Sequence, residues 1–339
     1  MPNTSWKPTR PPHPDDARYV RPAWLPGGHL QTIHGARCIR PPSIAFSRQR
    51  TETPDGDFID LDWLKPVDRS QSAGTRALLI FHGLEGSSLS PYAQSMAGYF
   101  HHRGWVVVVG HFRGCSGAPN RLVRAYHSGD ADDIAFMVDT VLRTLPEASW
   151  HLAGVSLGGN AMLRYLATPD KRHPELQACA AISVPLDLTA CGRHLSGSFL
   201  GRYLYTPQFL KTMKPKVAAK ARRFPEAFDA RRVARSATLM DFDDAYTAPV
   251  HGFQNVLDYW TRASSKPVLG HIQTPTLVLN ALNDPFVPAW SLPTQDEASP
   301  AIRLHQPPEG GHVGFVTGRW PGNLSWLPRR LDLFFLKRC

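Results

Sequence analysis

The chain has 339 residues, 42% of them hydrophobic, and its formal net charge is +10. This length suits one large domain with an insertion, or two small domains. A basic chain can bind nucleic acid, a membrane surface or an anionic substrate. No RNA-binding signature and no basic helix with base-reading side chains is present, so we interpret the charge as a solubilising surface and expect no nucleic-acid partner.

The pattern of cysteines and the shortness of the apolar runs indicate in which compartment the protein resides. Five cysteines are scattered along the chain without a C-x-x-C pair, which favours free thiols in a reducing compartment over disulfides or a zinc site. Residues 1–20 are polar and proline-rich and lack the apolar core of a signal peptide. No apolar run approaches the ~18 residues that a transmembrane helix needs. We therefore expect a cytoplasmic protein without stable membrane insertion.

The N-terminal part of the chain predicts an arm followed by a hairpin. Residues 1–40 are rich in proline and are expected to run over the surface as an extended arm, with the segment Trp24–Thr32 packed on the domain. Residues 44–51 and 58–63 are extended runs on either side of a Pro-Asp-Gly turn, which is typical of a β-hairpin.

Apolar strands and amphipathic helices then alternate. The expected strands are Ala77–Phe81, Trp105–Val109, His151–Val155, Ala178–Val184, Thr276–Asn280 and Ile302–His305. The expected helices are Tyr92–Arg103, Asp130–Leu145, Leu157–Ala167 and Leu324–Leu336. This order predicts an α/β fold, with a mostly parallel, doubly wound sheet that follows the N-terminal hairpin.

Residues 186–272 break this alternation and predict a mostly helical lid inserted between two strands of the sheet. The chain would thus divide into an arm (1–40), a core (41–185 and 273–339) and a lid (186–272). A basic stretch in the lid, Lys211–Arg223, either contacts phosphate or lipid head groups or forms a solvated helix face, and we favour the second interpretation. A group of apolar residues either lines an acyl channel or forms the lid's own core, which we favour: Phe199, Leu200, Tyr203 and Leu204.

A serine at the junction of a strand and a helix is the main candidate for chemistry. The pattern Gly154-x-Ser156-x-Gly158 is that of a nucleophile elbow, and it is expected by chance about 0.1 times in a chain of this length. Small residues on either side of the serine avoid collisions in a strained turn. The turn would hold the Ser156 hydroxyl in the open at a helix N-terminus.

A serine nucleophile needs a base, and the base needs an orienting acid. Asp284 follows the strand Thr276–Asn280, and His312 follows the last strand within a glycine-rich loop, so both belong at the carboxyl ends of strands. Their order, Ser156, Asp284, His312, is that of an α/β-hydrolase. Asp187 is the rival acid and His305 the rival base.

Two backbone N–H groups are the expected oxyanion donors. One belongs to Leu157, directly after the serine, and the other to the loop that follows the first central strand, where we favour Leu84 over Gly83. His82 in the same loop is expected to brace it by hydrogen bonding and not to act as a catalytic group.

Several motifs together resemble the YheT-like branch of the α/β-hydrolases, the AB hydrolase 4 family of esterases and lipid hydrolases. They cover almost the whole chain: Trp24-Leu-Pro-Gly-Gly-His-Leu-Gln-Thr32, His82-Gly-Leu-Glu-Gly86, His111-Phe-Arg-Gly-Cys-Ser-Gly117, Pro119-Asn-Arg121, Tyr126-His-Ser-Gly129, Gly154-Val-Ser-Leu-Gly-Gly-Asn160, Asp241-Phe-Asp-Asp244, Asn283-Asp-Pro-Phe286 and Gly310-Gly-His-Val-Gly-Phe315. The resemblance implies an α/β-hydrolase fold and carboxylic-ester hydrolysis by a Ser-Asp-His triad, without metal or cofactor. The family's triad falls on Ser156, Asp284 and His312.

The expected activity is therefore a serine carboxylic-ester hydrolase that forms an acyl-enzyme on short-acyl or acylglycerol-like esters. Its partner would be a small-molecule ester, lipids included. Two alternatives stay open: an acyltransferase that uses the same acyl-enzyme, and a ligand-binding protein on a hydrolase scaffold without useful turnover.

Overall fold

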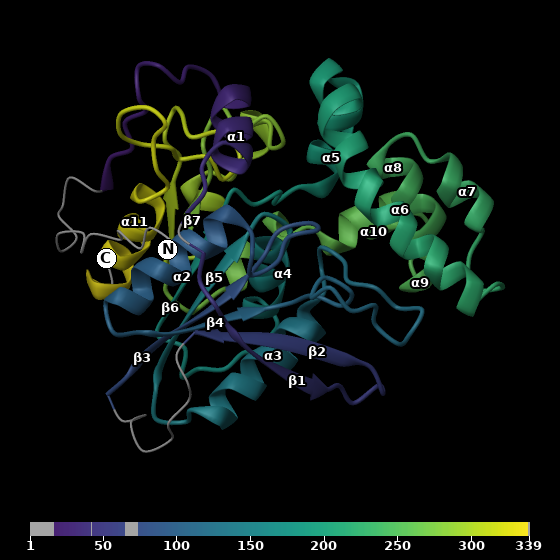
Figure 1. Ribbon diagram of the computed structural model, residues 1–339, viewed down its shortest axis with the longest axis horizontal. Helices are drawn as coiled ribbons and strands as arrows, with labels where there is room; N and C mark the ends of the chain where they lie inside the picture. The colour runs from purple at the N-terminus through teal and green to yellow at the C-terminus, as the bar shows by residue number, and fades with distance from the viewer. Residues whose placement is uncertain (1–16, 42, 65–73, 338–339) are drawn as a thin grey trace.

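The computed structural model describes residues 17–41, 43–64 and 74–337. They build an eight-stranded sheet in the order β1-β2-β4-β3-β5-β6-β7-β8, with helices on both faces (Figure 1). The strands are β1 (Ser47–Glu52), β2 (Phe58–Leu64), β3 (Arg76–Phe81), β4 (Val106–Gly110), β5 (Ser149–Val155), β6 (Ala178–Ile182), β7 (Thr276–Leu279) and β8 (Ile302–His305). The β1–β2 hairpin and the β2–β4 pair are antiparallel, and all other pairs are parallel. The predicted fold class is confirmed.

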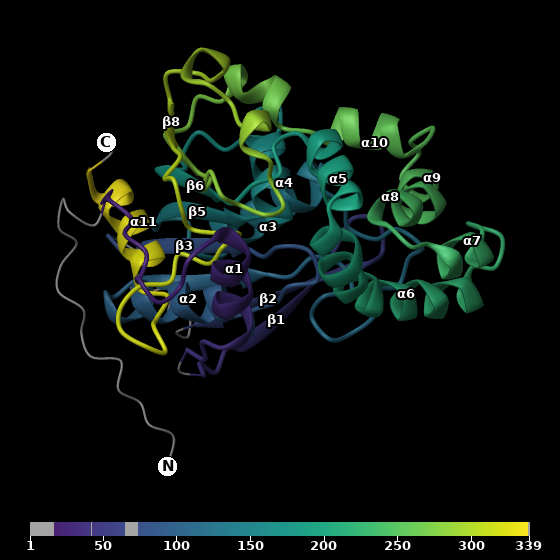
Figure 2. The ribbon, with the colours of Figure 1, turned by 90° about the horizontal axis from the view of Figure 1, so that it is seen from above.

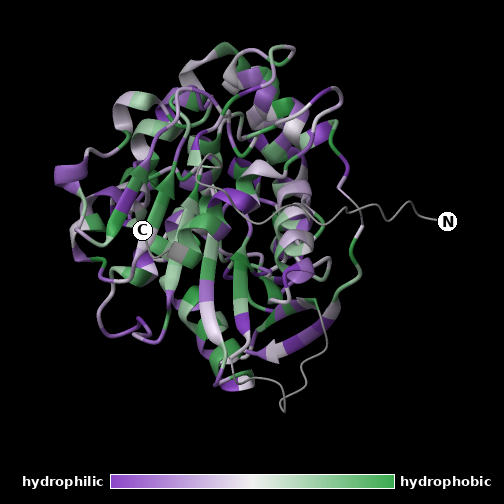
Figure 3. Cartoon of the chain, turned by 90° about the vertical axis from the view of Figure 1, so that its left-hand side faces the viewer, coloured by the Kyte–Doolittle hydropathy of each residue, from purple (hydrophilic) through white to green (hydrophobic). Residues whose placement is uncertain are grey.

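Side-chain alternation along the strands divides the core into two layers. In β3, Leu79 and Phe81 join the layer under α3 (Ala131–Thr144) and α4 (Leu157–Leu166). Leu78 and Ile80 point to the other face, under α2 (Pro91–His102) and α11 (Trp326–Lys337). Figure 3 shows the central strands largely in green, the colour of hydrophobic residues. Because helices cover both faces of the sheet, the side chains on both sides of the central strands are buried, and the sequences of these strands are continuously apolar.

The N-terminal segment differs from the expected extended arm, because residues Gly28–Arg37 form a helix, α1. Its buried side chains are polar or absent: Gln31, Thr32, His34 and Gly35. Periodic apolar residues, the usual signal for a helix, are therefore missing from this stretch. In Figures 1 and 2, α1 lies beside the yellow loops that follow β8. The rest of the expected arm, residues 1–16, lies outside the described residues.

Residues 188–271 contribute a group of helical segments beyond the sheet, drawn in teal to green in Figure 1. They are α5 (Leu188–Gly197), the π-helical turn η3 (Gly201–Tyr205), α6 (Thr206–Arg223), α7 (Ala230–Arg235), α8 (Leu239–Phe242), the π-helical turn η4 (Asp243–Thr247), α9 (Ala248–Val250), α10 (Val256–Ala263) and the 3-10 turn η5 (Lys266–His271). Two short 3-10 turns follow β7: η6 (Ala289–Ser291) and η7 (Gln295–Glu297). None of the described helices is long and apolar enough to cross a membrane.

The preferred interpretation of two lid residues is wrong. Phe199 and Tyr203 are 73% and 63% exposed and pack on each other, so they belong to neither a lid core nor a channel. The basic stretch lies on α6, and part of it holds the lid to the core. The Lys220 ammonium is buried and donates to the carbonyl oxygens of residues 122, 123 and 124 at 3.0, 3.0 and 2.6 Å.

Candidate active site

Ser156 lies at the turn between β5 and α4, with φ 52 and ψ −121. A side chain on either neighbouring glycine would collide with backbone. A Cβ on Gly154 would lie 2.6 Å from the Cα of Gly159, and one on Gly158 would lie 2.4 Å from the carbonyl oxygen of His82. The positive φ at a non-glycine residue stores strain that the surrounding packing must hold. The hydroxyl consequently projects from a fixed turn at the carboxyl edge of the sheet.

The structure brings the three residues of the predicted triad together. The imidazole of His312 lies between the other two, with Nε2 3.0 Å from the Ser156 hydroxyl and Nδ1 2.8 Å from Oδ2 of Asp284. The second carboxylate oxygen of Asp284 accepts the backbone N–H groups of Phe286 and Val287 at 2.8 and 3.3 Å. With Nδ1–H donating to the carboxylate, Nε2 is free to accept the serine proton.

The alternative acid, Asp187, and the alternative base, His305, form hydrogen bonds outside the triad. Asp187 caps α5, where its carboxylate accepts the N–H of Ala190 at 2.9 Å. His305 is part of β8, and its Nδ1 accepts the Arg330 guanidinium at 3.1 Å. Burial, with the nearby arginine charges, lowers the pKa of His305 to about 4. Neither side chain has a hydrogen bond to Ser156 or to His312.

The loop after β3 presents one free N–H between two occupied ones. The N–H of Gly83 donates to the Tyr92 hydroxyl at 2.8 Å, and that of Glu85 donates to the Tyr126 hydroxyl at 2.9 Å. The N–H groups of Leu84 and Leu157 have no partner among the hydrogen bonds of the described residues. Two unengaged N–H groups beside the serine are what an oxyanion needs. The geometry thus favours Leu84 over Gly83.

His82 braces this loop as expected. Its Nδ1 lies 2.8 Å from the carbonyl oxygen of Gly83, and its Nε2 accepts the N–H of Phe112 at 3.2 Å. These contacts fix the neutral tautomer with the proton on Nδ1. Burial, with the nearby His111, lowers the pKa of His82 to about 3. The imidazole therefore ties the loop after β3 to the loop after β4.

A cavity of about 630 Å³ opens over the serine, between the core and the lid. Its lining is mostly apolar and includes Ser156, His312 and both oxyanion candidates. The lid contributes Leu188, Leu195, Phe209, Met213, Phe242, Tyr246 and Trp260. None of the four residues considered for an acyl channel, Phe199, Leu200, Tyr203 and Leu204, is among its described lining residues. The volume and lining suit a ligand with an apolar chain.

The lid also touches the oxyanion loop directly. Lys216 of α6 pairs with Glu85 at 2.8 Å, and the Glu85 carboxylate accepts the Tyr126 hydroxyl at 2.9 Å. Glu85 itself has φ 56, a strained conformation next to Leu84. The ion pair therefore links the position of α6 to the backbone that carries one oxyanion candidate.

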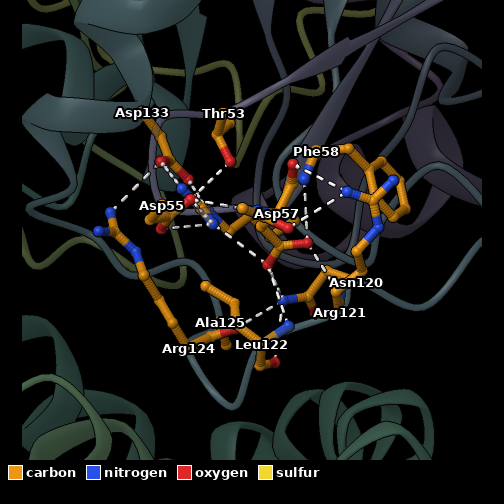
Figure 4. Close-up of polar contacts among 12 residues, drawn as sticks. Thr53, Asp55, Asp57, Phe58, Asn120, Arg121, Leu122, Arg124, Ala125 and Asp133 are labelled. Carbon is orange, nitrogen blue, oxygen red and sulfur yellow. Dashed lines mark hydrogen bonds and ion pairs between the residues drawn. The ribbon is translucent and has the colours of Figure 1, made fainter.

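A buried network centred on Asp57 (Figure 4) holds the segment after β4, several residues of which line the cavity, among them Arg113, Pro119 and Asn120. The Asp57 carboxylate accepts the amide of Asn120 at 2.7 Å, the N–H of Arg121 at 2.7 Å and the Arg113 guanidinium at 3.1 Å. Burial alone would raise the pKa of Asp57, but the hydrogen bonds from Asn120 and from backbone N–H groups outweigh it and hold the pKa below its usual value. Arg113 also pairs with Asp133 at 2.8 Å. The network fixes the loop that follows β4 to the β1–β2 turn.

Sequence reasoning missed several residues that support the site. The hydroxyls of Tyr92 and Tyr126 select the free N–H in the oxyanion loop, and Ser183 accepts the N–H of Val313, next to the histidine, at 3.0 Å. Gln31 and Thr32 of α1 contact the histidine loop. The signal for the last two was that the segment Trp24–Thr32 was expected to pack on the domain and is one of the motifs of the family resemblance. Within the described ranges, no group of three or more His, Cys, Asp or Glu residues is placed to hold a metal ion.

Comparison with known proteins places this site in a family. The alpha/beta hydrolase fold family matches residues 76–319. The provisional esterase YheT of Escherichia coli (strain K12) is 35% identical over 305 residues, which are 89% of this chain and 88% of that protein. Human phospholipase ABHD3 is 29% identical over 93% of this chain and 78% of its own length. Monoacylglycerol lipase of Saccharomyces cerevisiae is 26% identical over 79% of this chain and 58% of its own length.

A solved structure shows the same fold at low sequence identity. The Pyrococcus furiosus esterase Pf2001 superposes with a TM-score of 0.53 at 16% identity, and the match covers 95% of this chain and 98% of that one. At this identity the likeness concerns the fold alone. The family match and the 35% identity to YheT are decisive. The chain belongs to the α/β-hydrolase family, in the YheT-like branch of esterase- and lipase-type hydrolases.

Proposed function

We propose that the protein is a serine carboxylic-ester hydrolase that works through an acyl-enzyme. The observation that carries this proposal is the pair of hydrogen bonds on one imidazole, 3.0 Å to the Ser156 hydroxyl and 2.8 Å to the Asp284 carboxylate. A serine is a weak nucleophile unless such a base stands beside it. The relatives named as esterase, phospholipase and lipase support the same class of reaction.

The proposed reaction has two stages. Nε2 of His312 takes the proton as Oγ of Ser156 attacks the ester carbonyl, and the N–H groups of Leu84 and Leu157 donate to the oxyanion. The C–O bond of the ester then breaks, and the imidazolium gives its proton to the departing alcohol. Water attacks the acyl-enzyme with His312 again as the base, which releases the acid and restores the serine hydroxyl. Asp284 stabilises the imidazolium in both stages.

The cavity favours esters with an apolar acyl chain. Its volume of about 630 Å³ lies in the range typical of small-molecule sites, and the lid lines it with aliphatic and aromatic residues. We propose short-acyl and acylglycerol-like esters as the substrate class. Acyl transfer to another alcohol would pass through the same intermediate and is the second candidate function. Analysis of the products formed with competing alcohols distinguishes it from hydrolysis.

The test is an activity profile over p-nitrophenyl esters of increasing acyl length. Wild-type protein should hydrolyse them, and Ser156→Ala should lower kcat by at least about 10³-fold. Ser236→Ala, a buried serine of the lid whose hydroxyl donates to a backbone carbonyl, serves as the matched control and should leave turnover unchanged. Equal turnover by Ser156→Ala and wild type would refute the proposal. Binding of esters without any acyl-enzyme would favour a ligand-binding protein instead.

We keep the cytoplasm as the expected compartment. The described cysteines are free thiols: Cys38, Cys115, Cys179 and Cys191. Burial raises the pKa of Cys115 to about 12, so this thiol stays protonated and unreactive. Free thiols, of which Cys38 is exposed and the other three are buried, fit a reducing environment.

A further inference from the structure

The loop that carries His312 needs support from outside itself. It lies between β8 and α11 and combines left-handed backbone at Gly311, Val313 and Phe315, with φ 62, 58 and 37. Positive φ at valine and phenylalanine costs energy, and such a conformation persists only where neighbouring structure enforces it. Ser183 supplies part of this support by accepting the N–H of Val313, and α1, a helix far away in the sequence, supplies another part.

Thr32 of α1 holds the backbone of the histidine itself. Its hydroxyl donates its single proton to the carbonyl oxygen of Gly28 at 2.7 Å, and it accepts the N–H of His312 at 2.8 Å. Thr32 is buried, at 6% exposure, so water does not compete for these contacts. The backbone of His312 is therefore held by a side chain of α1, in addition to the contact of its imidazole with Asp284.

Gln31 joins the histidine loop to the acid loop. Its Oε1 accepts the N–H of Gly310 at 2.9 Å and the side-chain amide of Asn283 at 3.1 Å, while its Nε2 donates to the carbonyl oxygen of Leu25 at 3.1 Å. Gln31 is fully buried. Asn283 precedes Asp284, and its Oδ1 accepts the N–H of Gly311 at 3.0 Å. One amide group thus bridges the segments that carry the acid and the base.

The backbones of α1 and these loops are in direct contact. A Cβ on Gly28 would lie 1.8 Å from the carbonyl oxygen of Asn283, and one on Gly314 would lie 2.6 Å from the carbonyl oxygen of Gln31. No side chain fits at either place. Contact between main chains, reinforced by buried hydrogen bonds, leaves little freedom for the loops to move relative to the helix.

We propose that α1 sets the geometry of the triad, with Thr32 as the positioning residue for His312 and Gln31 as the residue that fixes the spacing between the acid and histidine loops. This inference rests on the proposed function. It gives the segment Trp24–Thr32 a role in catalysis in addition to its role in packing. A helix that merely packs affects the free energy of unfolding, whereas a positioning helix also affects kcat in the folded protein.

The test compares Thr32→Val, Thr32→Ser and the control Thr140→Val. Thr140 is also a buried helical threonine, and its hydroxyl donates to the carbonyl oxygen of Phe136, four residues earlier, as Thr32 does to Gly28. We expect Thr32→Val to lower kcat about 10- to 100-fold with KM nearly unchanged, because small misplacements of a catalytic group cost that much. Thr32→Ser keeps the acceptor and should restore kcat, and Thr140→Val should not lower it.

A second readout is independent of turnover. Hydrogen exchange of the peptide that spans residues 306–316 should be faster in Thr32→Val than in Thr140→Val or wild type, since the N–H of His312 loses its acceptor. Unchanged exchange together with at least half of the wild-type kcat would overturn the inference. Wild-type protein without turnover would refute the proposed function, and the exchange comparison would still decide whether α1 holds the loop. If Thr32→Val does not fold, Thr32→Cys, with a weaker acceptor, replaces it under the same criteria.

Discussion

Replacing Asp284 by asparagine should remove almost all turnover while leaving the fold intact. In the structure, Oδ1 of Asp284 accepts the N–H groups of Phe286 and Val287, and Oδ2 accepts Nδ1–H of His312. The amide of an asparagine has one oxygen only. That oxygen will face the two backbone N–H groups, because the opposite orientation would set the NH₂ group against them at a cost of about 1–3 kcal/mol for each unsatisfied group.

The consequence is the wrong tautomer of the imidazole. With an NH₂ group facing Nδ1, this nitrogen of His312 becomes the acceptor, and the proton moves to Nε2. Nε2 can then no longer accept the proton of Ser156, 3.0 Å away. We expect a loss of about 10⁴-fold in kcat, equivalent to about 5.5 kcal/mol of transition-state stabilisation.

The assay measures kcat on a p-nitrophenyl ester and, in parallel, the urea midpoint of unfolding. Asp187→Asn is the matched control, because this carboxylate accepts a backbone N–H at a helix N-terminus and has no hydrogen bond to His312. It should keep near-normal kcat. The reasoning would be refuted if folded Asp284→Asn kept more than about a tenth of wild-type kcat, or if Asp187→Asn lost as much.

Three further predictions concern stability. His82→Asn should make the urea midpoint of unfolding less dependent on pH. Burial lowers the pKa of His82 to about 3 in the folded protein, so below about pH 6.5 this histidine is protonated only in the unfolded chain, and the wild-type protein loses stability as the pH falls. An unchanged pH dependence of the midpoint in His82→Asn would contradict this. Asp57→Asn should cost about 1–3 kcal/mol in urea unfolding, because one carboxylate oxygen that accepts buried N–H groups becomes an NH₂ group, while Arg113 keeps its pair with Asp133. Asp139→Asn, at a half-exposed carboxylate that pairs with Arg143, should cost less than about 1 kcal/mol, and equal losses in Asp57→Asn and Asp139→Asn would argue against the network. Lys220→Met should lower the free energy of unfolding by about 1–2 kcal/mol and speed proteolysis within the lid. An unaltered urea midpoint would show that Lys220 does not anchor α6.

The parts of the fold that follow hydrophobic pattern were accessible from the sequence. The runs Ala77–Phe81 and Ile302–His305 predicted strands to within a residue, because strands buried on both faces are continuously apolar. Ser156, Asp284 and His312 could be selected because chain order and strand ends restrict where an α/β sheet can place a site. The structure then gives their mutual distances.

Features that depend on polar burial were not accessible. Helix α1 buries glutamine, threonine and histidine and carries no apolar stripe, so the stretch reads as an irregular arm. The hydroxyls of Tyr92 and Tyr126, which occupy the N–H groups on either side of that of Leu84, come from segments outside this loop. Phe199 and Tyr203 are large and apolar in an inserted segment, which suggested burial, but packing against each other leaves both exposed. Tertiary contacts decide all of these.

Covalent labelling by a fluorophosphonate probe, followed by peptide mass mapping, decides whether Ser156 is the nucleophile. One adduct is expected, on Oγ of Ser156, with labelling strongly slowed in His312→Ala because the base that activates the serine is lost. This assignment would be contradicted by ester turnover in wild-type protein without an adduct on Ser156, or by an adduct that maps to another residue.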